Sequence, residues 1–463
     1  MVLLRALFQA ANRQRLSSIH AISEAERRSH SIFKESSGVF AAQVMMLMAG
    51  VLNNFLVARM AGPDGKGLFY SLQLFAGTAL VLANFGIGPA AVYHFRRDDG
   101  FSVEDITAGL LWPSVLLGCV PLVLMAILRQ TSNTLFHTGV WGSAAMLAFA
   151  AVPAFTLVWN LSYLYLAKGE MAGYNLLRAS QSTLFAAVLL GLFLANVTQL
   201  RALVGGWIVA VWLPALLALI VLGRTVGIWT MPSRRFVKHA FEFGWRSHLG
   251  AVVQYMQHRA DVVLIMYFLP LRDLGVYSLA IGLVELLWYV PQSVSQVLMP
   301  HVASSTEADA DSLTSAFCRA SVTAAALLSL MLAVASTVVI PWLVPAFRSA
   351  IPVIWILLPG AVVASIFKVL SSDLNGRGQP LKTLFPPATA LVFSVAGCIY
   401  AIPRFGIIGA AVVTSLAYLL NASLYVYQYS RSSSITARSL VLLRASDLVW
   451  YRRLLLARRG VSF

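Results

Sequence analysis

Charged residues are scarce in this chain: Asp, Glu, Lys and Arg make up 11% of its 463 residues, whereas hydrophobic residues make up 59%. A typical soluble domain has about 25% charged residues. This shortage excludes an ordinary soluble protein. The apolar runs are continuous and do not alternate with polar residues, which argues against a transmembrane β-barrel. We therefore expect an all-α polytopic membrane protein.

Cysteine is also rare, and enzyme motifs are missing. The three cysteines, Cys119, Cys318 and Cys398, lie in or beside separate apolar runs and lack the spacing of metal ligands. We expect neither a disulfide nor a metal site. Motifs of the types GxxxxGK[ST], HExxH and GxSxG are absent, and the loop GPDGKG at 62–67 is typical of a tight turn between helices. We expect no cofactor and no enzymatic activity.

Bilayer-length apolar segments, by contrast, fill most of the chain. A helix needs roughly 20 apolar residues to cross a hydrocarbon core of about 30 Å. About twelve runs reach this length; they are 38–58, 67–93, 107–128, 140–166, 175–196, 201–223, 247–269, 274–299, 318–341, 350–370, 383–402 and 407–429.

The basic residues predict the orientation. Lys and Arg outnumber Asp and Glu by 34 to 18, and most of them fall with the two termini and the even-numbered loops. The basic residues on the other side are Arg59, Lys66, Arg129, Arg201, Arg272, Arg348 and Arg404. The positive-inside rule then places both termini in the cytoplasm. The charge favours anionic membrane lipids as partners of the basic ends, rather than nucleic acid; a purely topological role is the other interpretation.

The loops on the opposite side are short, the longest lying near 129–139. A membrane glycan polymerase or ligase is expected to need a sizeable external loop for its catalytic groups. The short loops therefore disfavour that class.

The two halves of the apolar region are similar to each other. Placing Gly67 over Gly275 aligns GLFYSLQLF with GVYSLAIGL and sets Asn53 over Asp261. Six spans separate the matched segments, so the repeat is parallel, and a binding site is expected between the halves. Chance similarity of apolar sequence is the other interpretation. The expected divisions are a basic N-terminal segment 1–37, a first lobe 38–223, a linker 224–246, a second lobe 247–429 and a basic tail 430–463.

Two spans of the second half carry charges at their centres. The run 247–269 contains Arg259 and Asp261, and the run 274–299 contains Glu285. A central charge costs about 2.5–3.5 kcal/mol on insertion scales, so it normally faces a bundle interior or a wet cavity. A rise of about 1.5 Å per residue puts Arg259 and Glu285 at one depth, which predicts an ion pair between them.

Polar and aromatic side chains surround these charges. The candidate cavity residues are Arg259, Gln254, His258, Trp288, Tyr289, Gln292, Gln296, Asn53 and Asn54, with Asp261 and Glu285 as coupling or ion-pair residues. Three interpretations stay open: a cavity for an anionic headgroup, a mutual neutralisation that locks the helices, and proton or sodium coupling. We expect a bend near Pro291. For Lys368 and Arg59, near span ends, a snorkelling role is favoured.

Three pairs of segments match a known family in order, over nearly the whole chain from about residue 38. They are LVARMAGPDGKGLFY with NFGIGPAAVYH, HRADVVLIMYFLPLRDLGVYSLA with VPQSVSQVLMPHVA, and LNGRGQPLKTLF with IPRFGIIGAAVVTSLAYLLNA. They resemble the polysaccharide-transport flippases of the multidrug/oligosaccharidyl-lipid/polysaccharide exporter superfamily.

This resemblance implies a MATE-like fold of two six-helix lobes that rock between inward-open and outward-open states. It implies that a polyprenyl-diphosphate-linked oligosaccharide crosses a bacterial inner membrane for O-antigen, capsule or exopolysaccharide synthesis. A polysaccharide polymerase or co-polymerase is a further candidate partner. The resemblance also implies a cationic central cavity, which Arg259 fits.

Two relatives would share the fold. A cation-coupled multidrug exporter is expected to carry a carboxylate in the first span, where this chain has Gln43, Asn53 and Asn54. A flippase for the peptidoglycan precursor is expected to have two further C-terminal spans, which the tail after Tyr429 does not supply. Both are disfavoured.

Overall fold

The computed structural model describes residues 2–96, 100–127, 141–225, 231–304, 306–432 and 440. Over these residues the chain is helical and contains no strand. Nine segments within the described ranges are long and apolar enough to cross a membrane.

Two of these segments, Ala42–Asn84 and Leu381–Arg431, are long enough for two crossings. Each is kinked at a glycine with positive φ, Gly62 (66°) or Gly406 (58°), a conformation that glycine adopts without steric cost. The helix α9 (Arg234–Phe268) adds one more crossing. Together the described segments account for the twelve crossings expected from the sequence.

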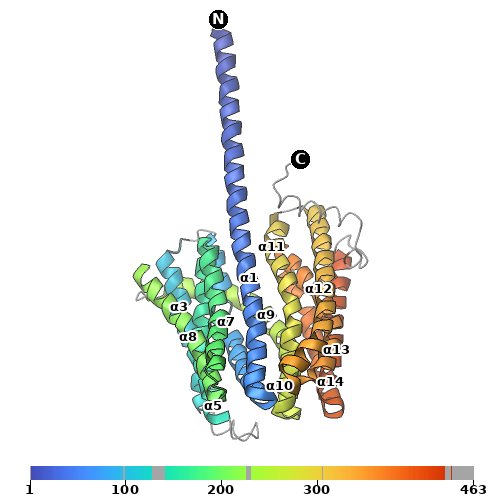
Figure 1. Ribbon diagram of the computed structural model, residues 1–463. Coiled ribbons are helices and arrows are strands. Elements are labelled where there is room, and N and C mark those ends of the chain that lie inside the picture. Colours follow the sequence, from blue (N-terminus) through green and yellow to red (C-terminus); the bar gives the residue numbers. More distant parts are fainter. Residues whose placement is uncertain are drawn as a thin grey trace.

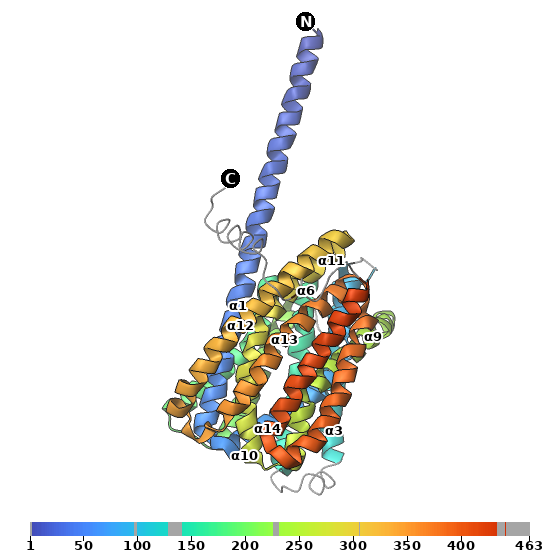
Figure 2. The ribbon, with the colours of Figure 1, turned by 90° about the vertical axis from the view of Figure 1, so that its right-hand side faces the viewer.

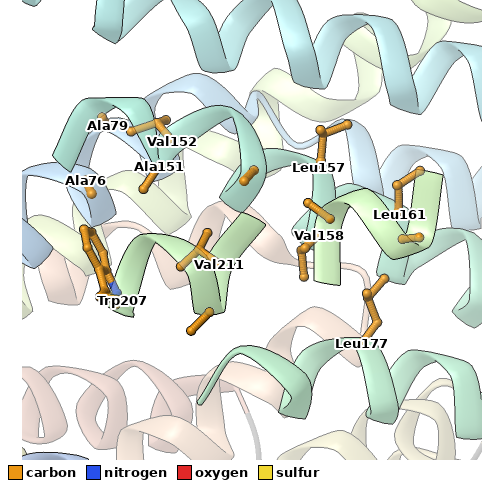
Figure 3. Close-up of a cluster of buried hydrophobic side chains, with 14 of the residues drawn as sticks. Ala76, Ala79, Ala151, Val152, Leu157, Val158, Leu161, Leu177, Trp207 and Val211 are labelled. Carbon is orange, nitrogen blue, oxygen red and sulfur yellow. The ribbon is translucent and has the colours of Figure 1, made fainter. Parts of the chain in front are cut away.

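The first half of the chain forms a bundle around one apolar core. Its helices are α1 (Val2–Asn84), α2 (Ile87–Arg96), α3 (Val103–Ile127), α5 (Trp141–Ala150), α6 (Val152–Lys168), α7 (Met171–Leu194) and α8 (Leu200–Thr225). Ala76, Val152, Leu161 and Trp207 belong to this core, which joins α1, α6 and α8 (Figure 3). Small side chains let the helix backbones approach closely, as membrane bundles require.

The second half forms another bundle, seen from its outer side in Figure 2. Its elements are α9, α10 (Leu271–Val284), the 3₁₀ turn η1 (Glu285–Trp288), α11 (Tyr289–Ser304), α12 (Glu307–Leu343), η2 (Pro345–Phe347), α13 (Ala350–Gly376), η3 (Pro380–Thr383) and α14 (Phe385–Ser432). The helix α13 packs against α11, α12 and α14, and α9 packs against α14.

The two halves meet where α1 passes beside α10, at the end of the molecule opposite the first turns of α1 (Figure 1). We call this contact the seam. A Cβ on Gly67 would overlap the carbonyl oxygen of Leu271, and one on Gly275 would overlap that of Pro63. Pro63 and Leu271 are related by the same offset as Gly67 and Gly275. The glycine contact, formed by these four residues, is therefore symmetric, as the parallel repeat predicts.

Arg59 adds a second contact across the same end. Its Nη1 donates a hydrogen bond to the carbonyl oxygen of Leu343, at the end of α12, over 2.9 Å. The Arg59 side chain is exposed, in keeping with its predicted place at a span end. The closed end of the seam thus combines a tight backbone contact with a peripheral hydrogen bond.

The lobe boundaries expected from the sequence stay predictions. The expected linker 224–246 is helical from Arg234 onward, and Phe236 is buried beside Phe101 in the core of the first half. Residues 226–230 and 433–439 lie outside the described residues, as do 441–463. The lipid contacts expected for both basic ends also stay predictions.

Candidate functional site

Arg259 on α9 and Glu285 in η1 form a bidentate ion pair on the side of the second bundle that faces α1. Arg259 Nη1 lies 2.6 Å from Glu285 Oε1, and Nη2 lies 3.3 Å from Oε2. Arg259 Nη1 also donates to the hydroxyl of Tyr70 on α1, over 3.3 Å. The ion pair expected from the sequence is present, and Tyr70 connects it to the first half. The fork-shaped guanidinium gives such a pair both strength and a fixed geometry.

The α-helical geometry is interrupted at Glu285. The helix α10 ends at Val284, and η1 follows before α11 begins. Pro291 has no N–H for the carbonyl of Leu287, and its ring crowds that carbonyl, so the turn before it tightens. The structure thus has a 3₁₀ turn that ends three residues before Pro291, where a bend was expected, and Glu285 is the first residue of that turn.

A cavity of about 260 Å³ lies along the seam, and we call it the seam cavity. The helix α1 supplies most of its polar lining, and α10, η1 and α11 supply the rest. Its polar residues are Asn53, Asn54, Lys66, Tyr70, Gln73, Ser278, Glu285 and Tyr289. Four predicted site residues thus lie together here: Asn53, Asn54, Glu285 and Tyr289. Arg259 reaches the cavity through its pairing with Glu285.

A second cavity, of about 250 Å³, lies within the second bundle, and we call it the C-half cavity. Every residue that lines it has a polar side chain: Gln254, Gln292, Ser295, Lys368, Ser371, Ser372 and Asn375. Gln254 and Gln292 were predicted as site residues, whereas Lys368 was expected to snorkel. Instead the Lys368 ammonium lies 4.5 Å from the centre of the Trp288 ring, within cation–π range.

His258 and Trp288 belong to an aromatic cluster and not to the lining of either cavity. The His258 ring lies 4.8 Å from Trp288, 5.7 Å from Tyr418 and 6.0 Å from Phe367. Both His258 nitrogens, the Trp288 Nε1 and the Tyr418 hydroxyl are buried without a hydrogen-bond partner. A direct contact of His258 or Trp288 with cargo stays a prediction, as does one of Gln296, whose side chain lies outside the described residues.

Asp261 is separated from Arg259 and lies in a buried hydroxyl network. Its Oδ2 accepts hydrogen bonds from Tyr277 over 2.5 Å and from Thr414 over 2.8 Å, and its Oδ1 accepts one from the Val262 N–H over 2.8 Å. Asp261 thereby connects α9, α10 and α14. Among the described residues no cluster of His, Cys, Asp and Glu could hold a metal ion.

Asp261→Asn should therefore lower the thermal stability of the purified protein. The substitution removes a charged acceptor, and a hydrogen bond to a charged group contributes about 1.5–3 kcal/mol. The melting temperature in detergent is the measurement, and Asp64→Asn, on an exposed turn residue, is the matched control. Unchanged stability together with lost transport would instead support ion coupling through Asp261.

Sequence reasoning missed the two lysines that line the cavities. Lys66 was assigned to an external loop, yet it is only 5% exposed, and its Nζ donates to Asn54 Oδ1 over 2.5 Å. The repeat held a usable signal, because its offset pairs Lys66 with Leu274, which is fully buried. Lys368 lies in an apolar run with no other charge before Asp373, but its position near the end of the predicted span 350–370 favoured a snorkelling role.

The arrangement can bind a polar, anionic group without covalent chemistry. Two polar cavities follow each other along Glu285, Tyr289 and Gln292, and each has a lysine in its lining. Amide and hydroxyl groups make up most of the remaining polar surface. Such a lining suits sugar hydroxyls and phosphate oxygens.

Comparison with known proteins gives relatives along most of the chain. A family model described as polysaccharide biosynthesis protein matches residues 32–306. The probable low-salt glycan biosynthesis flippase Agl15 of Haloferax volcanii is 21% identical over 428 residues, which cover 88% of each chain. An uncharacterized membrane protein of Methanocaldococcus jannaschii, MJ1068, is 29% identical over 197 residues, 41% of this chain and 38% of that one.

Solved structures share the fold. The lipid II flippase MurJ, in an inward closed conformation, has a TM-score of 0.68 at 12% identity, covering 86% of this chain and 87% of MurJ. An inward-facing multidrug resistance transporter of the MATE family has a TM-score of 0.65 at 13% identity. The match covers 86% of this chain and 98% of the transporter chain. These likenesses confirm the MATE-like membrane fold expected from the sequence.

The family match decides the classification. It begins in α1, runs through the ion pair and the seam, and ends just after α11, so that it includes more than half of the chain. This multi-span membrane protein belongs to the polysaccharide biosynthesis protein family.

Proposed function

We propose that the protein is a flippase that moves a polyprenyl-diphosphate-linked oligosaccharide from the cytoplasmic to the periplasmic leaflet of a bacterial inner membrane. The cargo would serve synthesis of O-antigen, capsule or exopolysaccharide. The protein would act by alternating access, with both termini in the cytoplasm, and would catalyse no covalent reaction. Similarity to the probable low-salt glycan biosynthesis flippase Agl15 of Haloferax volcanii supports this class of function.

The observation that carries the proposal is the seam cavity. It lies between the two halves, its lining is rich in amides, hydroxyls and charges, and the glycine contact closes the seam beside it. A cavity between repeats is where a transporter of this architecture binds its cargo. Rocking of the halves about this seam would expose the cavity to one leaflet at a time.

The energetics explain why such a cavity is needed. Transfer of an ionised group into a medium of low dielectric constant costs tens of kcal/mol, so a diphosphate does not cross hydrocarbon unaided. The polar lining of the seam replaces water around the headgroup, while the polyprenyl tail stays in lipid. The cargo must bind the two arrangements of the halves with different affinity, or it shifts no population between them.

Deletion of the gene tests this proposal. The lipid-linked oligosaccharide should accumulate with its sugar on the cytoplasmic face, because it is made there and cannot cross. A glycosidase should then cleave it in inverted membrane vesicles but not in right-side-out vesicles, and the wild-type gene should reverse the accumulation.

Other outcomes would indicate other functions. Accumulation of single glycan units on the periplasmic face would indicate a polymerase or ligase. Normal surface glycan together with increased retention of cationic dyes would indicate a multidrug exporter. Either result would overturn the flippase proposal.

A further inference from the structure

Lys66 brings a positive charge to the seam cavity, and no described carboxylate lies within ion-pair distance of its ammonium. Within the described part of the chain, no ion pair includes Lys66, whereas Arg259 is paired with Glu285. The charges of Arg259 and Glu285 cancel, so the charge of Lys66 is the one left over at this cavity. A buried ammonium is unfavourable unless a partner compensates it. An anionic ligand would supply that compensation.

Asn54 connects Lys66 to the other half of the molecule. Its Oδ1 accepts from Lys66 Nζ, and its Nδ2 donates to the carbonyl oxygen of Leu279 on α10, over 3.3 Å. Gly282 leaves room for this amide, since a Cβ there would lie 2.7 Å from Asn54 Nδ2. We call this chain of hydrogen bonds the Asn54 bridge.

The Asn54 bridge runs beside the glycine contact. Lys66 directly precedes Gly67 in the chain, and Leu279 lies about one helical turn after Gly275 on α10. Separation of α1 from α10 must therefore break the bridge together with the glycine contact. Lys66 donates to the oxygen of the same amide whose Nδ2 contacts α10, so a change at Lys66 acts directly on that amide.

An anion in the seam cavity would compete with Asn54 for Lys66. The Asn54 oxygen is a neutral acceptor that carries only a partial charge, whereas a diphosphate oxygen carries a full negative charge, so Coulomb attraction to the ammonium favours the diphosphate. The ammonium also carries three donors, more than its two contacts with Asn54 use. A diphosphate is thus able to draw Lys66 away from the amide.

We propose that Lys66 contacts the diphosphate of the cargo, and that this contact releases the Asn54 bridge and loosens the closed end of the seam. The inference rests on the function proposed above, because it assigns the cargo's anionic group to one residue. Lys66 would then have two roles: it binds the anionic group of the cargo, and its loss from the Asn54 bridge on binding weakens the contact between α1 and α10.

Accessibility of the seam cavity from the periplasmic side tests the inference. Gly50→Cys is a suitable reporter, because Gly50 lines the cavity and a Cβ there meets nothing within 4 Å. The full-length protein, with its three native cysteines replaced by alanine, is labelled in right-side-out vesicles with a membrane-impermeant maleimide. Inorganic pyrophosphate, loaded inside the vesicles, serves as the probe.

With Lys66 present, labelling should be slow and should rise about tenfold with pyrophosphate, the factor that corresponds to about 1.4 kcal/mol. Lys66→Gln should label fast without pyrophosphate and should not respond to it. Lys66→Arg should keep the response because it keeps the charge. Lys168→Gln, at an exposed helix end, is the matched control and should behave like the parent.

Asn54→Ala separates anion binding from release of the seam. It should label fast without pyrophosphate, yet pyrophosphate should still raise its melting temperature, because Lys66 is intact and a ligand of the folded state stabilises it. Lys66→Gln should lose that stabilisation. A pyrophosphate response in Lys66→Gln equal to that of the parent, or slow labelling of both variants, would overturn the inference.

The vesicle assay does not depend on the identity of the glycan. If the gene deletion leaves glycan export intact while pyrophosphate still acts through Lys66, the flippase proposal fails and the anion contact stands. If deletion blocks export while pyrophosphate has no effect on labelling, the Lys66 inference fails and the flippase proposal stands.

Discussion

Gly275→Ala should hold α1 and α10 apart and reduce surface-polysaccharide export to background. The added methyl group would overlap the carbonyl oxygen of Pro63, a backbone atom that cannot rotate away. Overpacking of a tight contact costs about 1–3 kcal/mol and occasionally more. Gly67→Ala should have the same effect, because its methyl group would overlap the carbonyl oxygen of Leu271. Export and periplasmic labelling of a cysteine at position 50 are the measurements.

Gly205→Ala is the matched control for this prediction. Gly205 is also a helical glycine in an apolar span, but a Cβ there meets nothing within 4 Å. Replacement of an unhindered helical glycine by alanine should be neutral or stabilising, by about 0.5–1 kcal/mol. Normal export by both Gly275→Ala and Gly67→Ala would show that the glycine contact is dispensable.

Arg259→Ala should abolish export while the protein stays in the membrane. The substitution leaves Glu285 without its bidentate partner in a site where the two side chains are 22% and 23% exposed. Removal of one partner from a buried ion pair costs about 3–5 kcal/mol, and access of water to the cavity places this pair at the lower end. Export, protein abundance in the membrane fraction and melting temperature are measured together.

The exchange of both charges, Arg259→Glu with Glu285→Arg, separates the two roles considered for Arg259. A pair that chiefly holds α9 against η1 should regain stability and most of its export when the charges are exchanged. We expect this recovery, because the ion pair is bidentate and Lys66 carries the uncompensated charge. Recovered stability without recovered export would assign a direct headgroup contact to Arg259.

Most of the fold could be predicted from the sequence, because the bilayer imposes the length of each span. The positions of most membrane-spanning helices were predicted from the apolar runs and from the short turns and glycines between them. The Arg259–Glu285 pair was predictable for the same reason, since helix rise alone sets the depth of both residues. The structure differs in a few places: the run 67–93 is divided between α1 and α2, the run 140–166 is divided between α5 and α6, and a tightened turn comes before Pro291.

The division of the site into two cavities was not predictable in this way. Depth follows from residue number, but the face that a residue presents depends on the rotation of each helix about its axis. A helix such as α8, which is apolar on all sides, carries no periodic signal to fix that rotation. Gln254, His258 and Asp261 were all expected to belong to one site, and the structure places the three in different surroundings.

The burial of Lys66 was missed for a related reason, although its repeat counterpart, Leu274, is apolar. A count of charges in each loop predicts the side of the membrane on which a basic residue lies. It does not predict which side chains that residue contacts. The glycine contact brings the backbone of α10 beside the start of the second crossing, and this covers Lys66. Such burial depends on a meeting of two segments far apart in the chain, which no local pattern encodes.

The glycine contact has the form of a two-fold dimer interface within one polypeptide. Gly67 meets Leu271, Gly275 meets Pro63, and each residue of one pair is the repeat counterpart of a residue in the other. In an isologous dimer, residue i of one subunit contacts residue j of its partner, and j contacts i. A six-span subunit paired with a copy of itself would present the same contact, so duplication and fusion of such a gene would inherit it. Lys66 lies beside this contact, and its repeat counterpart is Leu274. This difference would then mark a position at which the two copies diverged and the site became asymmetric.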